Sequence, residues 1–287
     1  MKKIIKNILD MLFPIECIGC GEEAKWLCDY CLSKIDLNKK QVCPLCGRFF
    51  NMGDSCVCAV NNGIDIYVTF LDLKKNPVAT KLIHCLKYNF IQDIAKILAQ
   101  IVSSEFLHSY TQILNTIDKN IIFIPIPLHK KRMLWRGFNQ AESILMEIGV
   151  SAETHESARI RNESARILNI RNDILARKKN TLFQGKRKMR EKDREKNMRD
   201  AFEIDTNQPA DLAGEHESGP AVASGEAMAD EDEFTRKGTV ETVKALMGKT
   251  VILFDDVITT GSTMESAARV LKEEGARRVI GMAIGKG

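Results

Sequence analysis

The chain has 287 residues, enough for one large domain or two modest ones, and its 44% hydrophobic and 28% charged residues suit a folded globular protein. These figures exclude a mainly disordered or collagen-like chain, and no apolar run approaches the roughly 20 residues of a membrane-spanning helix. The net charge of +4 does not by itself indicate a class of partner.

The first thirteen residues begin with lysines, as a secretory signal does, but Lys6, Asn7 and Asp10 interrupt the apolar stretch. Isoleucines and leucines recur at helical spacing, which predicts a short amphipathic helix that ends before Pro14. We therefore expect a cytoplasmic protein. Association of this helix with a membrane surface is the alternative interpretation.

Eight of the nine cysteines form four closely spaced pairs in the first 58 residues: Cys17, Cys20, Cys28, Cys31, Cys43, Cys46, Cys56 and Cys58. Two Cys-x-x-Cys turns can together close a tetrahedral four-sulfur shell around zinc, at roughly 2.3 Å per bond. Such a shell leaves no position for water, so we expect structural zinc. The spacing fits two ions held by adjacent or interleaved pairs, or one ion with four spare thiols. A disulfide framework is disfavoured in a reducing compartment.

Three elements are predicted in the middle of the chain. Apolar residues at helical spacing predict a helix over residues 79–88, on which the lone Cys85 is expected to be a core residue. Residues 121–126 predict a buried strand, and a further helix is predicted from Ala141 to about Ile148.

A basic stretch separates this strand from the helix that follows it. Lys130, Arg132 and Arg136 could neutralise a diphosphate near the end of the strand, and a solvated basic turn is the alternative. Trp135 and Phe138 lie in the same stretch, and we expect them to be packing residues rather than a platform for stacking bases.

Charge is distributed unevenly after residue 150. The sequence Glu-Ser-Ala-Arg-Ile occurs twice at a seven-residue period, which predicts a helix within residues 151–170. Residues 177–199 hold eleven basic and three acidic residues, a net charge of +8. Residues 200–235 hold eleven acidic residues and neither Lys nor Arg, a net charge of −11. Residues 206–236 have the composition of a disordered acidic insertion.

The most informative stretch lies near the C-terminus. The apolar run of residues 251–254 predicts a strand buried on both faces of a parallel sheet, ended by Asp255 and Asp256. A turn rich in hydroxyl groups follows and leads into a helix: Thr259, Thr260, Gly261, Ser262 and Thr263. Ser262 and Glu265 have the spacing of a capping box, which marks the start of that helix. A second strand over residues 278–284 completes a β-α-β unit.

This turn offers backbone N–H groups and the positive end of a helix dipole to an anion. The two aspartates would repel a bare phosphate, so the ligand should also bring hydroxyl groups or a bridging metal. A sugar phosphate meets both conditions, with its hydroxyls donating to the aspartates and its 5′-phosphate in the turn. The spacing matches neither the ATP-type loop nor the dinucleotide loop.

The order of apolar strand, two acids and Thr-Thr-Gly-Ser-Thr resembles the phosphoribosyl pyrophosphate loop of type I phosphoribosyltransferases. Together with the cysteine pairs, it makes the chain similar to the competence protein F (ComF) family of bacterial zinc-ribbon proteins. Further stretches that resemble this family are residues 82–88, 124–129, 136–140, 177–184 and 194–202.

The resemblance implies an α/β fold, in which a type I phosphoribosyltransferase-like parallel sheet with flanking helices is preceded by a small zinc-ribbon domain. We expect residues 1–62 to form the N-terminal helix and a double zinc ribbon, and residues 63–287 to form the second domain.

The same resemblance implies binding of phosphoribosyl pyrophosphate with Mg²⁺. Asp255 and Asp256 would contact the ribose hydroxyls, residues 259–263 would hold the 5′-phosphate, and Lys130, Arg132 and Arg136 would lie near the diphosphate. Residues 177–199 would form a flexible loop that closes over the ligand, or a surface for single-stranded DNA. A solvated helix face is the alternative for this segment.

At the level of the cell, the resemblance implies a role in natural competence and DNA uptake. The chain is then a phosphoribosyltransferase with an unknown acceptor, or a non-enzymatic protein that handles single-stranded DNA. In the second case the zinc ribbon and the basic segment would contact DNA or a helicase-like partner, and the phosphoribosyl site would be a ligand sensor. The intact loop argues against a scaffold in which both sites are vestigial.

Overall fold

The computed structural model describes residues 14–38, 43, 46, 48, 63–118, 120–154, 168–179, 201–205 and 245–287. Several predictions concern residues outside these ranges: the N-terminal helix, the cysteines at positions 56 and 58, the repeat of residues 156–167, the basic segment beyond residue 179 and the acidic insertion.

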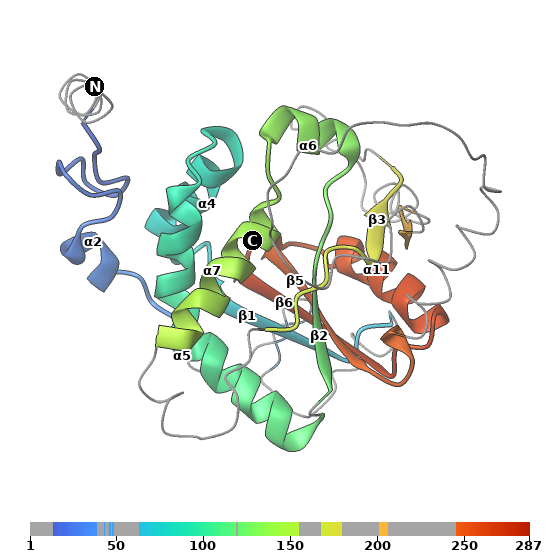
Figure 1. Cartoon of the computed structure of the whole chain (residues 1–287). Helices are drawn as coiled ribbons and strands as arrows, with labels where there is room; N and C mark the ends of the chain where they lie inside the picture. The colour runs from blue at the N-terminus through green and yellow to red at the C-terminus, as the bar shows by residue number, and fades with distance from the viewer. Residues whose placement is uncertain are drawn as a thin grey trace, which may run out of the picture.

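Four parallel strands form the central sheet, in the order β1-β6-β5-β2 (Figure 1). The strands are β1 (Ile66–Asp72), β2 (Ile121–Pro125), β5 (Thr250–Ile258) and β6 (Arg278–Lys286). Each is an apolar run buried along most of its length, as expected for parallel strands covered by helices on both faces. The predicted α/β fold with a parallel sheet is confirmed.

Helices cover both faces of this sheet (Figure 1). One face packs against α4 (Pro77–Tyr88), α5 (Asp93–Thr116) and α7 (Gln140–Thr154). The other face packs against α11 (Ser262–Glu273) and against the antiparallel pair of β3 (Leu175–Arg177) and β4 (Phe202–Ile204). Within the described ranges, no helix is both long enough and apolar enough to cross a membrane.

Strand β5 continues beyond the point at which the sequence predicted its end. Asp255 stays in register with Ala283 of β6, and Ile258 stays in register with Lys286. Strand β2 accompanies β5 only as far as Phe254. Both aspartates therefore lie within β5, beyond the level at which β2 has ended.

The basic turn of the middle region is a short helix, α6 (Lys130–Arg136), which Gly137 ends with a φ of 81°. The repeat of residues 156–167, for which a helix is predicted, lies outside the described residues. Residues 169–171, which follow it, lie along β2. There the Phe123 N–H donates to the Asn169 carbonyl and the Arg171 N–H donates to the Phe123 carbonyl, each at 2.8 Å.

The segment after the first two cysteine pairs is bound to the outer edge of β1. The Asn38 N–H donates to the Phe70 carbonyl at 2.8 Å. Asn76 is 2% exposed, and its side chain accepts from the Asp36 N–H at 2.8 Å and donates to the carbonyl oxygens of Asp36 and Asp72. Apolar residues between the cysteines also pack against the main core. The cysteine segment and the sheet therefore share one core.

Candidate functional site

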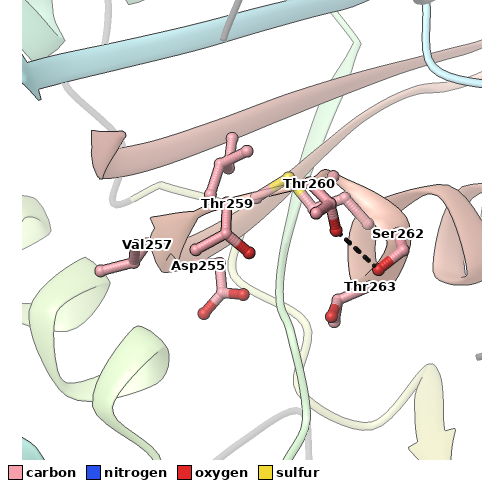
Figure 2. A pocket seen from close by; sticks show the side chains of 9 residues that line it. Asp255, Val257, Thr259, Thr260, Ser262 and Thr263 are labelled. Atoms are coloured by element: carbon pink, nitrogen blue, oxygen red, sulfur yellow. Dashed lines mark hydrogen bonds between the residues drawn. The ribbon is translucent and has the colours of Figure 1, made fainter. Parts of the chain in front are cut away.

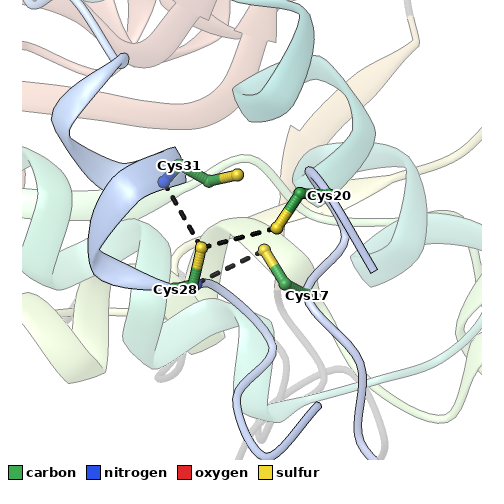
Figure 3. Close-up of side chains that lie close together, drawn as sticks. All are labelled: Cys17, Cys20, Cys28 and Cys31. Carbon is green, nitrogen blue, oxygen red and sulfur yellow. Dashed lines mark hydrogen bonds between the residues drawn. The ribbon is translucent and has the colours of Figure 1, made fainter. Parts of the chain in front are cut away.

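Four cysteine side chains converge beside the short helix α2 (Asp29–Ser33): Cys17, Cys20, Cys28 and Cys31 (Figure 3). Their sulfur atoms all lie within 4.8 Å of one another, and the Sγ atoms of Cys20 and Cys28 are 3.6 Å apart. A tetrahedral ZnS₄ centre with bonds of roughly 2.3 Å has sulfur atoms about 3.8 Å apart. The cluster therefore fits a zinc ion, held by two adjacent Cys-x-x-Cys pairs.

Backbone N–H groups are already directed at these sulfur atoms. Cys28 N–H donates to the Cys17 sulfur at 3.3 Å, and Cys31 N–H donates to the Cys28 sulfur at 3.4 Å. Burial raises the pKa of Cys17, but the N–H donors outweigh it and hold that pKa at about 6. Burial raises the pKa of Cys31. Since zinc binds thiolates, this environment already favours the form of Cys17 that a metal requires.

The structure describes only part of the second cysteine group. Cys43 is buried, Cys46 is exposed, and the Cys43 N–H donates to the Arg48 carbonyl at 2.9 Å. Cys56 and Cys58 lie outside the described residues. A second zinc ion held by these four cysteines therefore stays a prediction.

A pocket opens at the end of β5, where the loop of residues 259–263 leads into α11. Its lining runs from Asp255 through Val257 to Met264 and includes every residue of the predicted phosphate loop (Figure 2). The hydroxyl oxygens of Thr260 and Ser262 lie 3.0 Å apart. Carboxylate, hydroxyl groups and the N-terminus of a twelve-residue helix thus surround one space.

The predicted capping box is wrong. The residue before α11 is Gly261, in a left-handed conformation with a φ of 81°, and no side chain caps the helix. Glycine tolerates this conformation because it has no Cβ. The Ser262 hydroxyl lies against Thr260 instead of capping the helix, so the first turn of α11 keeps backbone N–H groups available for an anion.

The two aspartates occupy different environments. Asp255 lines the pocket, and its Oδ1 accepts from the Asp256 N–H at 2.8 Å. Asp256 is not among the pocket residues and is 5% exposed. Its Oδ2 lies 2.7 Å from Nζ of Lys87, the residue before the last of α4.

These environments shift the pKa values of the groups. Burial and then the neighbouring charge of Asp256 raise the pKa of Asp255 to about 8. Burial alone would lower the pKa of Lys87, but the charges of Asp256 and Asp255 outweigh it and raise that pKa. Lys87 and Asp256 therefore form an ion pair next to a carboxyl group whose pKa is raised.

Three arginines add positive charge close to the aspartates: Arg132 and Arg136 of α6, and Arg177 of β3. Burial lowers the pKa of each, to about 10 for Arg177, so all three remain charged at neutral pH. The charge of Asp256 acts on Arg136 and that of Asp255 acts on Arg177, which places both guanidinium groups near the acids. Lys130 is exposed at the start of α6, and its role at the diphosphate stays a prediction.

Sequence reasoning left one residue of this site without a role. Lys87 lies in the stretch of residues 82–88 that resembles the ComF family, but its role could not be derived because its partner, Asp256, comes from the far end of the chain. Trp135 was predicted to pack, but it is 59% exposed. Phe138 does pack against the core, as predicted, and Cys85 is partly buried against the same core.

The chain matches two protein families in separate regions. The double zinc ribbon domain matches residues 8–59, and the phosphoribosyl transferase domain matches residues 215–284. A relative, competence protein ComFC of Bacillus subtilis (strain 168), is 25% identical over 263 residues, which cover 87% of this chain and 79% of that protein. The cysteine cluster and the loop of residues 259–263 lie within the two matched regions, so structural zinc and a phosphoribosyltransferase-type domain belong to one chain.

We expect Asp255→Asn to raise the thermal unfolding midpoint of the ligand-free protein, and to do so more at pH 8.5 than at pH 5. The pKa of Asp255 is about 8 in the folded protein against an ordinary 3.8, so this carboxyl group stabilises folding at low pH and loses that contribution as the pH rises to about 8. The asparagine amide does not ionise, so the variant does not lose stability in this way as the pH rises. In a chain of this size, a change of about 1 kcal/mol in the free energy of unfolding moves the unfolding midpoint by about 2–4 °C.

Calorimetric or fluorescence melting curves at the two pH values measure this difference. Asp93→Asn, at an exposed position on α5, is the matched control. An Asp255→Asn shift that is the same at both pH values contradicts the raised pKa.

We expect Cys31→Ser to remove one zinc ion per chain, because the buried Cys31 thiol belongs to the four-sulfur cluster. The measurement is the zinc content after gel filtration in reducing buffer, together with the unfolding midpoint, which should fall with the loss of zinc. Cys85→Ser, a lone cysteine on α4, is the control. Equal zinc content in the two variants would show that the cluster holds no zinc.

Proposed function

Since the chain belongs to the ComF family, whose members join a zinc ribbon to a type I phosphoribosyltransferase domain, we propose that its pocket binds phosphoribosyl pyrophosphate together with Mg²⁺. The observation that carries this proposal is the lining of the pocket, in which a carboxylate, a hydroxyl-rich loop and a helix N-terminus surround one space. Each of these groups suits a different part of a sugar phosphate.

The loop of residues 259–263 receives the 5′-phosphate. Backbone N–H groups at the start of α11 donate to its oxygens, and the positive end of the helix dipole favours its charge. The hydroxyl groups of Thr260 and Ser262 supply further donors. The carboxylates that precede the loop, Asp255 and Asp256, bind the ribose through its hydroxyl groups.

The diphosphate lies toward the arginines of α6 and β3. Arg132, Arg136 and Arg177 are partly buried cations, and a polyanion between them relieves their mutual repulsion. The carboxylate and hydroxyl oxygens of the pocket are ligand types that Mg²⁺ prefers, and the ion supplies charge neutralisation to the diphosphate. In a transfer reaction, the bond from the anomeric carbon to the diphosphate oxygen would break, and the diphosphate would leave with the bonding electrons toward these cations.

In the cell we propose a role in natural competence, in line with the printed name of the Bacillus subtilis relative, competence protein ComFC. A cytoplasmic location and a task in processing incoming DNA go with this role. Zinc is structural in the proposal, since four protein sulfur atoms leave no position for a substrate.

We expect titration calorimetry to detect binding of phosphoribosyl pyrophosphate to the wild-type protein in the presence of Mg²⁺, and weaker binding without the ion. The double variant Asp255→Ala/Asp256→Ala should bind at least about 100-fold more weakly, because it loses the hydrogen-bond acceptors for the ribose hydroxyls. Asp93→Ala, at an exposed acidic position on α5, is the control. No binding to the wild type at millimolar ligand overturns the proposal.

A second function, the handling of single-stranded DNA, is favoured by the exposed face of α6. Within this helix, Leu134 is 86% and Trp135 is 59% exposed, and four of its seven residues are cations. The Trp135 ring meets Phe90 edge-on with centroids 5.0 Å apart. Exposed aromatic rings among cations are typical of surfaces that stack bases and contact the sugar-phosphate backbone. On this view the sugar-phosphate pocket is a ligand sensor, and a helicase-like partner receives the DNA.

We expect Trp135→Ala to weaken binding of a labelled oligothymidylate about 5- to 100-fold in fluorescence anisotropy, the usual cost of losing one stacked base. Raising the salt concentration should weaken the binding of wild type and variant alike. Met146→Ala, at an exposed apolar position on α7, is the control. Equal affinity of the two variants for the oligothymidylate would show that α6 is not part of the DNA-binding surface.

A further inference from the structure

Three aromatic side chains gather on the surface between the end of α4 and α6. Tyr88 is the last residue of α4, Phe90 follows that helix closely, and Trp135 belongs to α6. Tyr88 is 43% and Phe90 is 40% exposed, and Trp135 is more exposed than either. We call these three residues the aromatic platform. Single exposed apolar residues need no explanation, but a group of them from two elements marks a binding surface.

The backbone of Phe90 gives a second reason to regard the platform as a binding surface. Its φ is 58°, in the left-handed region that bulky side chains rarely adopt and that glycine adopts without strain. The ring meets Trp135 edge-on instead of entering the core, whereas the next residue, Ile91, packs against the core. A strained backbone that holds an exposed ring in place points to a function for that ring.

Arg136 connects the platform with the acid pair of β5. Its guanidinium carbon lies 5.8 Å from the ring centroids of both Tyr88 and Trp135, within the range of a cation–π contact. Burial lowers the pKa of Arg136 and the charge of Asp256 opposes this shift, so the guanidinium group also lies near the acids. Its Nε is buried and has no hydrogen-bond partner among the described residues. The group is therefore placed between two surfaces, with an N–H left to donate to a ligand.

We propose that Arg136 is shared between the sugar-phosphate pocket and a surface for single-stranded DNA on the aromatic platform, so that the two ligands compete for the protein. The inference rests on both proposed functions and adds the regulation of one by the other. A DNA strand stacks its bases on the platform and directs its backbone phosphates to Arg132 and Arg136. Phosphoribosyl pyrophosphate directs its diphosphate to the same two guanidinium groups.

The charges of the site explain why the two ligands exclude each other. Arg132 and Arg136 lie close together, since the charge of Arg132 contributes to the lowered pKa of Arg136. One polyanion relieves this repulsion. A second polyanion would meet cations that are already neutralised and would be repelled by the first. Because coupling between two sites is reciprocal, each ligand weakens the binding of the other by the same factor.

The test is a set of affinities measured on the full chain, by fluorescence anisotropy for a labelled oligothymidylate and by calorimetry for phosphoribosyl pyrophosphate with Mg²⁺. We expect saturating phosphoribosyl pyrophosphate to weaken oligothymidylate binding by about tenfold or more, as for loss of hydrogen bonds to a charged group. Saturating oligothymidylate should weaken the binding of phosphoribosyl pyrophosphate by the same factor. Sodium chloride at equal ionic strength is the control for screening.

Two variants separate a shared residue from two independent sites. Arg136→Met should weaken the binding of each ligand alone and remove most of the competition between them. Lys96→Met, at an exposed cation on α5, is its control and should leave the competition unchanged. Phe90→Gly keeps the left-handed backbone, so it should weaken oligothymidylate binding by about 5- to 100-fold while the affinity for phosphoribosyl pyrophosphate stays the same.

The outcomes distinguish this inference from the functions on which it rests. If the wild-type protein binds both ligands together with unchanged affinities, the inference is overturned and both proposed functions stand. Competition that persists in full in Arg136→Met also overturns it. Failure of one ligand to bind on its own is a different result, which removes the function proposed for that ligand together with this inference.

Discussion

The parallel pairing of β5 with β6 carries the sheet past both aspartates before the chain turns into the loop. Continued pairing holds both acids within the strand and brings the loop of residues 259–263 to the start of α11. The same two strands therefore place Asp255 at the pocket and Asp256 beside Lys87 of α4.

The positively charged side chains of the site come from separate elements of the fold. Lys87 comes from α4, Arg132 and Arg136 come from α6, and Arg177 comes from β3. The charge of Arg132 lowers the pKa of Arg177, so the ligand-free protein holds like charges close together. Binding a polyanion relieves this repulsion, and any ligand that binds only the folded state stabilises it.

Local patterns account for what the sequence predicted correctly. The apolar runs of β2, β5 and β6, the glycine and hydroxyl groups of the loop, and the Cys-x-x-Cys turns are each signals within a few neighbouring residues. The errors concern residues whose role depends on a distant part of the chain or on the backbone conformation. Lys87 meets a residue from the far end of the chain, Trp135 is on the outer face of a helix too short to show a period, and Gly261 replaces the predicted cap through its backbone conformation.

Both outer edges of the sheet are covered by short extended segments, residues 36–38 along β1 and residues 169–171 along β2. An uncovered edge presents backbone N–H and C=O groups that pair readily with another chain. The cover of β1 follows α2, which carries Cys31 of the four-cysteine cluster. A metal ion held by that cluster would therefore help to keep this segment against β1, and loss of the ion would expose an edge strand that can pair with another chain.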